Sequence, residues 1–146
     1  MKQIIAILAL VLFSILSVTA QDRQALRLCR RVQTAFSRGL GSLDRRHLLR
    51  GHLVMTIENS GADIVDPEYE TRHFATFRAM EQWLKRRENK EGAPWRLSGE
   101  KPECSRGRCL MYMQGGTLHN HVYLEKMFYG YRRGRIYLKR LYVMYG

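Results

Sequence analysis

The pattern of apolar and polar positions divides the chain into an apolar leader, helical segments and a strand-rich C-terminal half. The first twenty residues carry one lysine and no carboxylate, and the stretch Ile4–Val18 is almost entirely apolar. A short charged start, an apolar stretch of this length and the small residues Thr19 and Ala20 are typical of a secretory signal peptide cut after Ala20. We therefore predict a secreted or periplasmic protein in which residues 21–146 form a single domain. A membrane anchor formed by an uncleaved leader is the alternative.

Downstream of the leader, apolar residues recur at helical intervals on one face, and arginines occupy the opposite face. This period of 3.6 residues predicts a helix that begins at a capping Asp22 and ends at Gly39 and Gly41. A second, short helix is predicted at Leu43–Arg50. The apolar stripe of the first helix consists of Ala25, Leu28, Cys29, Val32, Ala35, Phe36 and Leu40.

The middle of the chain predicts a small hairpin followed by a third helix. His52–Glu58 is rich in strand-forming residues, and Ala62–Val65 is the expected returning strand. The helix His73–Glu88 presents an apolar face that needs a sheet beneath it. Its start is predicted either at the capping Asp66, which a proline follows, or at Thr71.

The C-terminal half predicts strands separated by turns, with tyrosines concentrated in the last two. Helices first and strands later indicate an α+β fold, with N-terminal helices packed on a curved antiparallel sheet of about four to six strands. Gly130 is the expected bend or bulge that curves the sheet. The predicted strands are Trp95–Gly99, Cys109–Gln114, His121–Tyr131 and Ile136–Tyr145.

Without the leader, the predicted domain is strongly basic. Loss of the leader leaves 24 Lys and Arg against 13 Asp and Glu, a net charge of about +11, with the excess at the two ends of the domain. Such a surface attracts polyanions such as anionic lipid or acidic glycans, and it also keeps a protein soluble. No dedicated nucleic-acid motif is present, and an exported chain seldom meets nucleic acid.

Three cysteines cannot all pair within one molecule. Cys104 and Cys109 flank a turn-forming stretch, and an exported protein meets an oxidising compartment, so we predict a disulfide between them that pins a hairpin. Cys29 then remains as a buried apolar residue of the first helix. His119 and His121 lie two apart and could face the same side of a strand, but the sequence offers no further metal ligand, and we predict no metal site.

A second cluster of candidate binding residues surrounds the last predicted turn. Arginines flanked by tyrosines bind phosphate, sulfate or glycan acids through forked hydrogen bonds, and charges at a hairpin tip also discourage edge-to-edge sheet pairing. Arg106 and Arg108 of the disulfide turn are candidates to join this patch. The predicted anion-binding residues are Arg132, Arg133, Arg135, Lys139 and Arg140.

The order of elements resembles the nuclear transport factor two-like superfamily, the cone-shaped α+β fold of scytalone dehydratase, ketosteroid isomerase and polyketide cyclases. The stretch Phe128–Tyr142 is similar to the closing hairpin of that family, and the resemblance covers most of the chain after Asp22. The cystatin-like fold is the neighbouring option. Enzymes of the cone fold use an aspartate or histidine inside the cone as a general base, so the resemblance implies these candidates: Asp63, Asp66, His119, His121 and Tyr129.

No motif for acyl transfer, nucleotide binding or zinc-protease chemistry occurs, and no cofactor is implied. We therefore expect an exported binding or accessory domain with a basic surface, which holds a small ligand or protein partner, or an anionic surface, without catalysis. The alternative is a cofactor-independent isomerase, dehydratase or hydrolase that uses an Asp or His inside the cone. An open sheet would also leave an apolar face suited to a homodimer.

Overall fold

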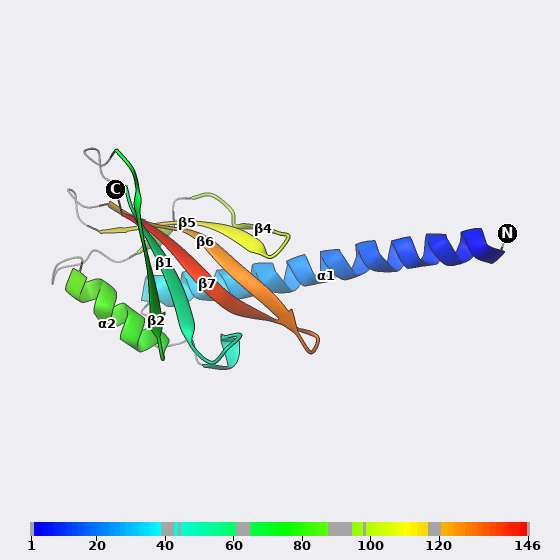
Figure 1. Ribbon diagram of the computed structural model, residues 1–146, viewed down its shortest axis with the longest axis horizontal. Helices are drawn as coiled ribbons and strands as arrows, with labels where there is room; N and C mark the ends of the chain where they lie inside the picture. The colour runs from blue at the N-terminus through cyan, green and yellow to red at the C-terminus, as the bar shows by residue number, and fades with distance from the viewer. Residues whose placement is uncertain are drawn as a thin grey trace.

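The computed structural model describes residues 2–38, 43, 45–60, 65–87, 95–97, 99–116 and 121–145. Within these residues the fold is α+β, as predicted: a long N-terminal helix and a short one pack against one sheet (Figure 1). The elements are α1 (Lys2–Arg38), η2 (Arg45–His47), β1 (Leu53–Asn59), β2 (Glu68–Phe74), α2 (Phe77–Arg87), β3 (Arg96–Leu97), β4 (Glu103–Ser105), β5 (Arg108–Gly116), β6 (His121–Arg132) and β7 (Arg135–Tyr145).

Helix α1 is continuous across the boundary between the leader and the predicted domain. The prediction that a helix starts at Asp22 is therefore wrong. No glycine or proline interrupts the stretch from Ile4 to Arg38, so each turn extends the one before it. The described side chains from Ile4 to Ser14 are exposed, with Phe13 at 74%. We call Ile4–Ala20 the apolar half of α1. Helix α1 is long and apolar enough to cross a membrane, and both a signal sequence and an anchor have that property.

The strands form one sheet of seven in the described part of the chain, where the sequence predicted about four to six. The order is β2-β1-β7-β6-β5-β3, and β4 also pairs with β5. The pair β1–β7 is parallel, whereas the other pairs are antiparallel. A parallel pair requires a long connection, and here β2, α2 and the strands β3 to β6 lie between β1 and β7 in the sequence. This arrangement places the C-terminal strand in the middle of the sheet.

The hairpin β1–β2 differs from its prediction in the position of the second strand. Glu68–Phe74 pairs residue for residue with Leu53–Asn59. Val65, expected at the end of the returning strand, is instead an exposed bend, and residues 61–64 lie outside the described residues. The segment 71–74, predicted as helix, is a strand because β1 supplies hydrogen-bond partners that local sequence does not reveal.

Helix α2 begins at Phe77, so the starts predicted at Asp66 and Thr71 are both wrong. The hydroxyl of Thr76 accepts a hydrogen bond from the backbone N–H of Ala79 at 3.1 Å and caps the first turn. The apolar face of α2 enters the core as predicted, through Phe77, Met80 and Leu84.

Arg87 at the end of α2 holds the helix to the β1–β2 hairpin. Its guanidinium donates to Asn59 Oδ1 at 2.8 Å and to Glu70 Oε2 at 3.1 Å, and lies 4.5 Å from the ring centroid of Tyr145. Arg72 also pairs with Glu70. Burial raises the pKa of Glu70, but the hydrogen bonds and charges of the two arginines outweigh it, and the pKa lies below its usual value.

The core lies between the helices and one face of the sheet. Strand β1 buries alternate residues, Leu53, Met55 and Ile57, and the predicted stripe of α1 is buried from Ala25 to Phe36. Leu40 of that stripe lies outside the described residues. One face of each helix and one face of the sheet therefore exclude water together.

The segment after α1 forms the 3-10 turn η2, and the helix predicted at Leu43–Arg50 is reduced to this turn. Leu48 then bridges in parallel to Leu138 of β7. A Cβ on Gly130 would lie 2.7 Å from a methyl carbon of Leu49, so any larger residue at this strand position would force the Leu49 side chain to shift. The register of β6 shifts just before Gly130, between Phe128 and Tyr129, which is consistent with the predicted bulge.

Candidate functional site

A cavity of about 440 Å³ opens between α1, η2 and the first residues of β7. Its wall carries four arginines and one histidine, and none of its described lining residues has a carboxylate. The apolar part of the wall comes from Leu28 and Ile136 together with the ring of Tyr137. The basic lining residues are Arg27, Arg31, Arg46, His47 and Arg135.

The helical repeat of α1 explains how two of these arginines reach one cavity. Arg27 and Arg31 are four residues apart, so their side chains lie on the same side of the helix, one turn from each other. Leu28, which is 6% exposed, packs in the core and fixes the rotation of this part of α1. The two guanidinium groups are therefore held at the border of the core, opposite η2.

A second cavity of about 390 Å³ continues along α1 toward its C-terminus. It shares Arg31, Arg46 and His47 with the first cavity and adds Arg30 and the apolar side chain of Leu43. We call the two together the basic groove. Its charged and titratable described residues are Arg27, Arg30, Arg31, Arg46, His47 and Arg135.

Arg31 of α1 and His47 of η2 are in contact across the basic groove. The Nη1 atom of Arg31 lies 3.3 Å from the Nε2 atom of His47. A guanidinium has no acceptor atom, so it donates and the imidazole accepts. Within the described part of the chain, Arg27, Arg31 and Arg135 have no carboxylate partner. Arginine stays charged at every physiological pH, so the groove gathers positive charge that a bound anion would neutralise.

The predicted anion-binding residues are only partly brought together. Arg135 lines the groove. Arg132 and Arg133 are exposed at the β6–β7 turn, where Arg133 adopts a positive φ of 49°. Lys139 and Arg140 are exposed on β7 and line none of the described cavities.

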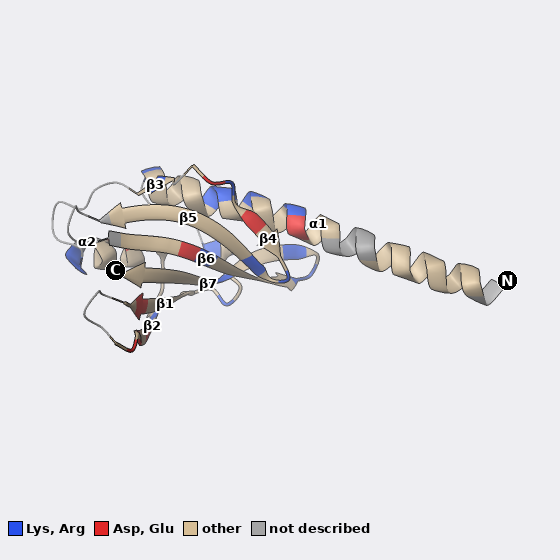
Figure 2. Ribbon diagram, turned by 90° about the horizontal axis from the view of Figure 1, so that it is seen from above, with Lys and Arg blue, Asp and Glu red and all other residues tan. Residues whose placement is uncertain are grey.

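Sequence reasoning missed most of the groove. It assigned Arg27, Arg30 and Arg31 to the solvent-facing side of a helix, which is correct, but no local signal placed them beside Arg46 and Arg135. Figure 2 shows Lys and Arg positions along the part of α1 that packs on the sheet, whereas the described residues Ile4–Ser14 carry no charge. In both ribbon views the β6–β7 turn lies at the end of the domain from which the apolar half of α1 projects.

The candidate general bases do not form a cluster among the described residues. Asp66 is exposed in the bend before β2, an edge strand, whereas β6 carries Tyr129 and is separated from β2 by β1 and β7. Asp63 and His119 lie outside the described residues. His121 is the first residue of β6, and the structure describes its backbone but not its side chain.

Tyr129 has a structural contact that accounts for its burial. It is 9% exposed, and its hydroxyl donates to Asp22 Oδ1 at 3.0 Å, which ties α1 to β6. Burial and the neighbouring carboxylate both raise the pKa of Tyr129, because each disfavours the phenolate. Asp22 is thus an anchor between helix and sheet rather than the predicted helix cap.

Cys104 and Cys109 form the predicted disulfide, and Cys29 is a buried free thiol, also as predicted. The strand β4, which carries Cys104, lies within the segment predicted as a turn. The three sulfurs are the group in the described chain whose spacing suits a metal ion, but two of them are bonded to each other and are not available as thiolates.

No protein-family model matches this chain, and neither the curated proteins nor the solved structures contain a significant match to it.

Proposed function

We propose that this chain is an exported binding module whose basic groove holds an anionic group of a ligand or partner without catalysing a reaction. The observation that carries the proposal is the convergence of Arg27, Arg31, Arg46 and Arg135, from three separate elements, on one cavity with no described carboxylate in its wall. Arg27, Arg31 and Arg135 have no carboxylate partner among the described residues, so they repel one another, and an anion in the groove would offset that repulsion.

The chemistry of the groove favours a phosphate, sulfate or carboxylate. Guanidinium groups offer paired donors that match two oxygens of such an anion, and a recess partly shielded from water strengthens each charge-assisted bond. The apolar wall at Leu28, Ile136 and Tyr137 would contact the carbon skeleton that carries the anion. A glycan acid or a phosphorylated small molecule has both parts.

Export is supported by the exposed apolar half of α1 and by the disulfide of β4 and β5. We propose cleavage after Ala20, which leaves Gln21–Gly146 as a secreted or periplasmic domain. If the leader is retained, the same geometry holds the arginine-rich β6–β7 turn on the side of the membrane. We also propose kinship with the nuclear transport factor two-like fold. It is supported by the order of α1, the β1–β2 hairpin, α2 and the strands that follow.

Titration calorimetry of residues 21–146 with inorganic pyrophosphate and, separately, with a heparin-derived hexasaccharide tests the groove. The double variant R31A/R135A removes one cation from each wall, and we expect it to weaken binding at least about 10-fold, because a hydrogen bond to a charged group contributes about 1.5–3 kcal/mol. The control K139A/R140A removes the same charge from exposed positions of β7 and should change affinity less than about 2-fold.

Two results would contradict the proposal. If neither probe binds the wild-type domain, the groove does not hold a phosphate or a sulfated glycan. If the two double variants lose equal affinity, the net charge of the domain attracts the probe and the groove does not. The two probes separate a compact phosphate ligand from an extended sulfated one.

A further inference from the structure

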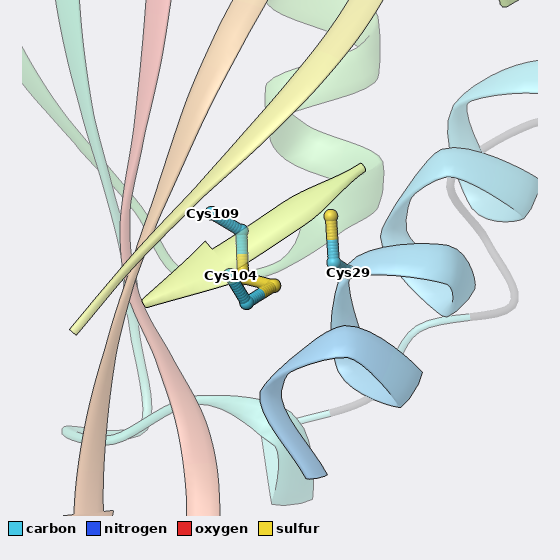
Figure 3. Close-up of side chains that lie close together, drawn as sticks. All are labelled: Cys29, Cys104 and Cys109. Atoms are coloured by element: carbon cyan, nitrogen blue, oxygen red, sulfur yellow. A yellow bond between two sulfur atoms is a disulfide. The ribbon is translucent and has the colours of Figure 1, made fainter. Parts of the chain in front are cut away.

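The buried thiol of Cys29 lies directly beside the disulfide. The Sγ atoms of Cys29, Cys104 and Cys109 all lie within 4.8 Å of one another, and Figure 3 shows Cys29 of α1 next to the disulfide that joins β4 and β5. Cys29 and Cys109 are fully buried, whereas Cys104 is half-buried. A third sulfur at this distance from both members of a disulfide forms a site for chemistry that the basic groove does not use.

We propose that Cys29 is an internal nucleophile that exchanges with the disulfide to give a Cys29–Cys109 bond and a free thiol on Cys104. The Cys29 thiol loses its proton to water, and the thiolate attacks Cys109 Sγ. The Cys104–Cys109 bond breaks, and Cys104 leaves as a thiolate that takes up a proton. The reaction is an isomerisation, with one disulfide and one thiol before and after, and it needs no oxidant or reductant.

Burial decides which of the two sulfurs is attacked. Attack on Cys104 would release a Cys109 thiolate into a fully buried position, where water cannot stabilise the charge. Attack on Cys109 releases the thiolate on Cys104, a residue that is only half-buried. Arg106 and Arg108, in the turn and strand beside Cys104, add positive charge that favours this leaving group.

The folded chain holds the reaction in check. Burial raises the pKa of the Cys29 thiol to about 12, and the charge of Arg30 offsets only part of the effect. The attacking thiolate is therefore scarce near neutral pH. Exchange therefore becomes faster as pH rises, because a larger fraction of Cys29 is then thiolate beside the disulfide.

The product differs from the starting structure in two useful ways. A Cys29–Cys109 bond fastens α1 covalently to β5, and thus fixes the helix that carries one wall of the basic groove. The freed thiol belongs to the half-buried Cys104, close in sequence to Arg106 and Arg108, a setting that favours reaction with a low-molecular-weight disulfide or a partner disulfide. The structure thereby assigns Cys104 as a latent modification site that Cys29 controls.

Peptide mapping of the full chain tests the exchange. The protein is incubated at pH 8 with iodoacetamide, quenched in acid and digested with trypsin without reduction. Arginines lie between each pair of cysteines in the sequence, so trypsin separates the three sites. We expect Cys104 to become alkylated while Cys29 becomes linked to Cys109. Alkylation of Cys29 with the original disulfide retained, or no linkage between Cys29 and Cys109 after prolonged incubation, would overturn the proposal.

Two variants sharpen the test. In C29A, alkylation of Cys104 should fall at least about 10-fold, since no internal nucleophile remains; an unchanged rate would refute the role of Cys29. In C104S, glutathione disulfide should oxidise Cys29 and Cys109 to a disulfide with release of two glutathione molecules. If C104S, folded by circular dichroism, does not form this bond, the geometry proposed for the exchange is wrong. The mapping of the wild-type chain decides the matter even if a variant fails to fold.

Discussion

Gln33 joins α1 to an irregular point of the sheet, and its replacement offers a quantitative test of how the helix is held. The register of β5 against β6 shifts between Leu110 and Met113, and Tyr112 there has a positive φ of 53°. The Nε2 atom of Gln33, a residue only 5% exposed, donates to the carbonyl oxygen of Met111 at 2.6 Å. Met111 lies inside the shift, where the ladder has no paired position on β6, so the side chain of the helix supplies the donor that the strand does not.

The expected loss in the free energy of unfolding depends on whether the Met111 carbonyl keeps a hydrogen-bond donor after the substitution. Gln33→Met keeps the length and volume of the side chain but leaves the Met111 carbonyl buried without this donor, at a cost of about 1–3 kcal/mol in the free energy of unfolding. Gln33→Glu is nearly isosteric, but its carboxylate faces a carbonyl oxygen and must stay protonated to donate. Its pKa in the folded state would therefore be raised. The free energy of unfolding of this variant, relative to the wild type, should be greatest below the unfolded pKa of about 4.3. It should decline as pH rises through the folded pKa.

Urea denaturation of residues 21–146, followed by circular dichroism, measures these changes. The matched control is Gln24→Met, the same substitution at an exposed position of α1, which we expect to alter stability by less than about 0.5 kcal/mol. Equal stability of the wild type and Gln33→Met would show that the bond to Met111 does not hold the helix. A Gln33→Glu variant that gained stability relative to the wild type from pH 4 to pH 7 would refute the assigned direction of the hydrogen bond.

Three further changes probe other contacts. Tyr129→Phe removes the hydrogen bond to Asp22 and should lower the free energy of unfolding by about 0.5–1.5 kcal/mol in the same urea assay. An unchanged free energy of unfolding would show that this bond does not stabilise the contact between α1 and β6. Gly115→Ala places a Cβ 2.8 Å from the Trp95 ring, so the ring must move. We expect the free energy of unfolding to fall by about 1–3 kcal/mol and the tryptophan emission to change. An unchanged emission would contradict this packing. The lowered pKa of Glu70 means that the unfolded chain binds more protons, so its contribution exists above a pH of about 4.5 and disappears as pH falls through the folded pKa. Glu70→Gln should therefore flatten the acid side of the stability profile, and a profile identical to that of the wild type would contradict the pairing.

The sequence predicted the elements whose signals are local. The stripe from Ala25 to Phe36 is buried as its period indicated, because a helix face depends only on spacing along the chain. The last two strands are present with nearly the predicted bounds. The errors fall on Glu68–Phe74 and the start of α2, where pairing with β1 overrides local preference and Thr76, not Asp66 or Thr71, supplies the cap.

Local patterns along the chain were therefore enough to predict the apolar leader, the amphipathic face of α1, the strand-rich second half and the pairing of Cys104 with Cys109. Tertiary structure alone decided that Arg27 and Arg31 lie across a groove from Arg135, and that Cys29 lies beside the disulfide. Arg31 and Arg135 are 104 positions apart and Cys29 and Cys104 are 75 apart, and periodicity carries no information about contacts over such separations. Packing of α1 against the sheet brings their charges and sulfurs together, and that packing depends on the whole core.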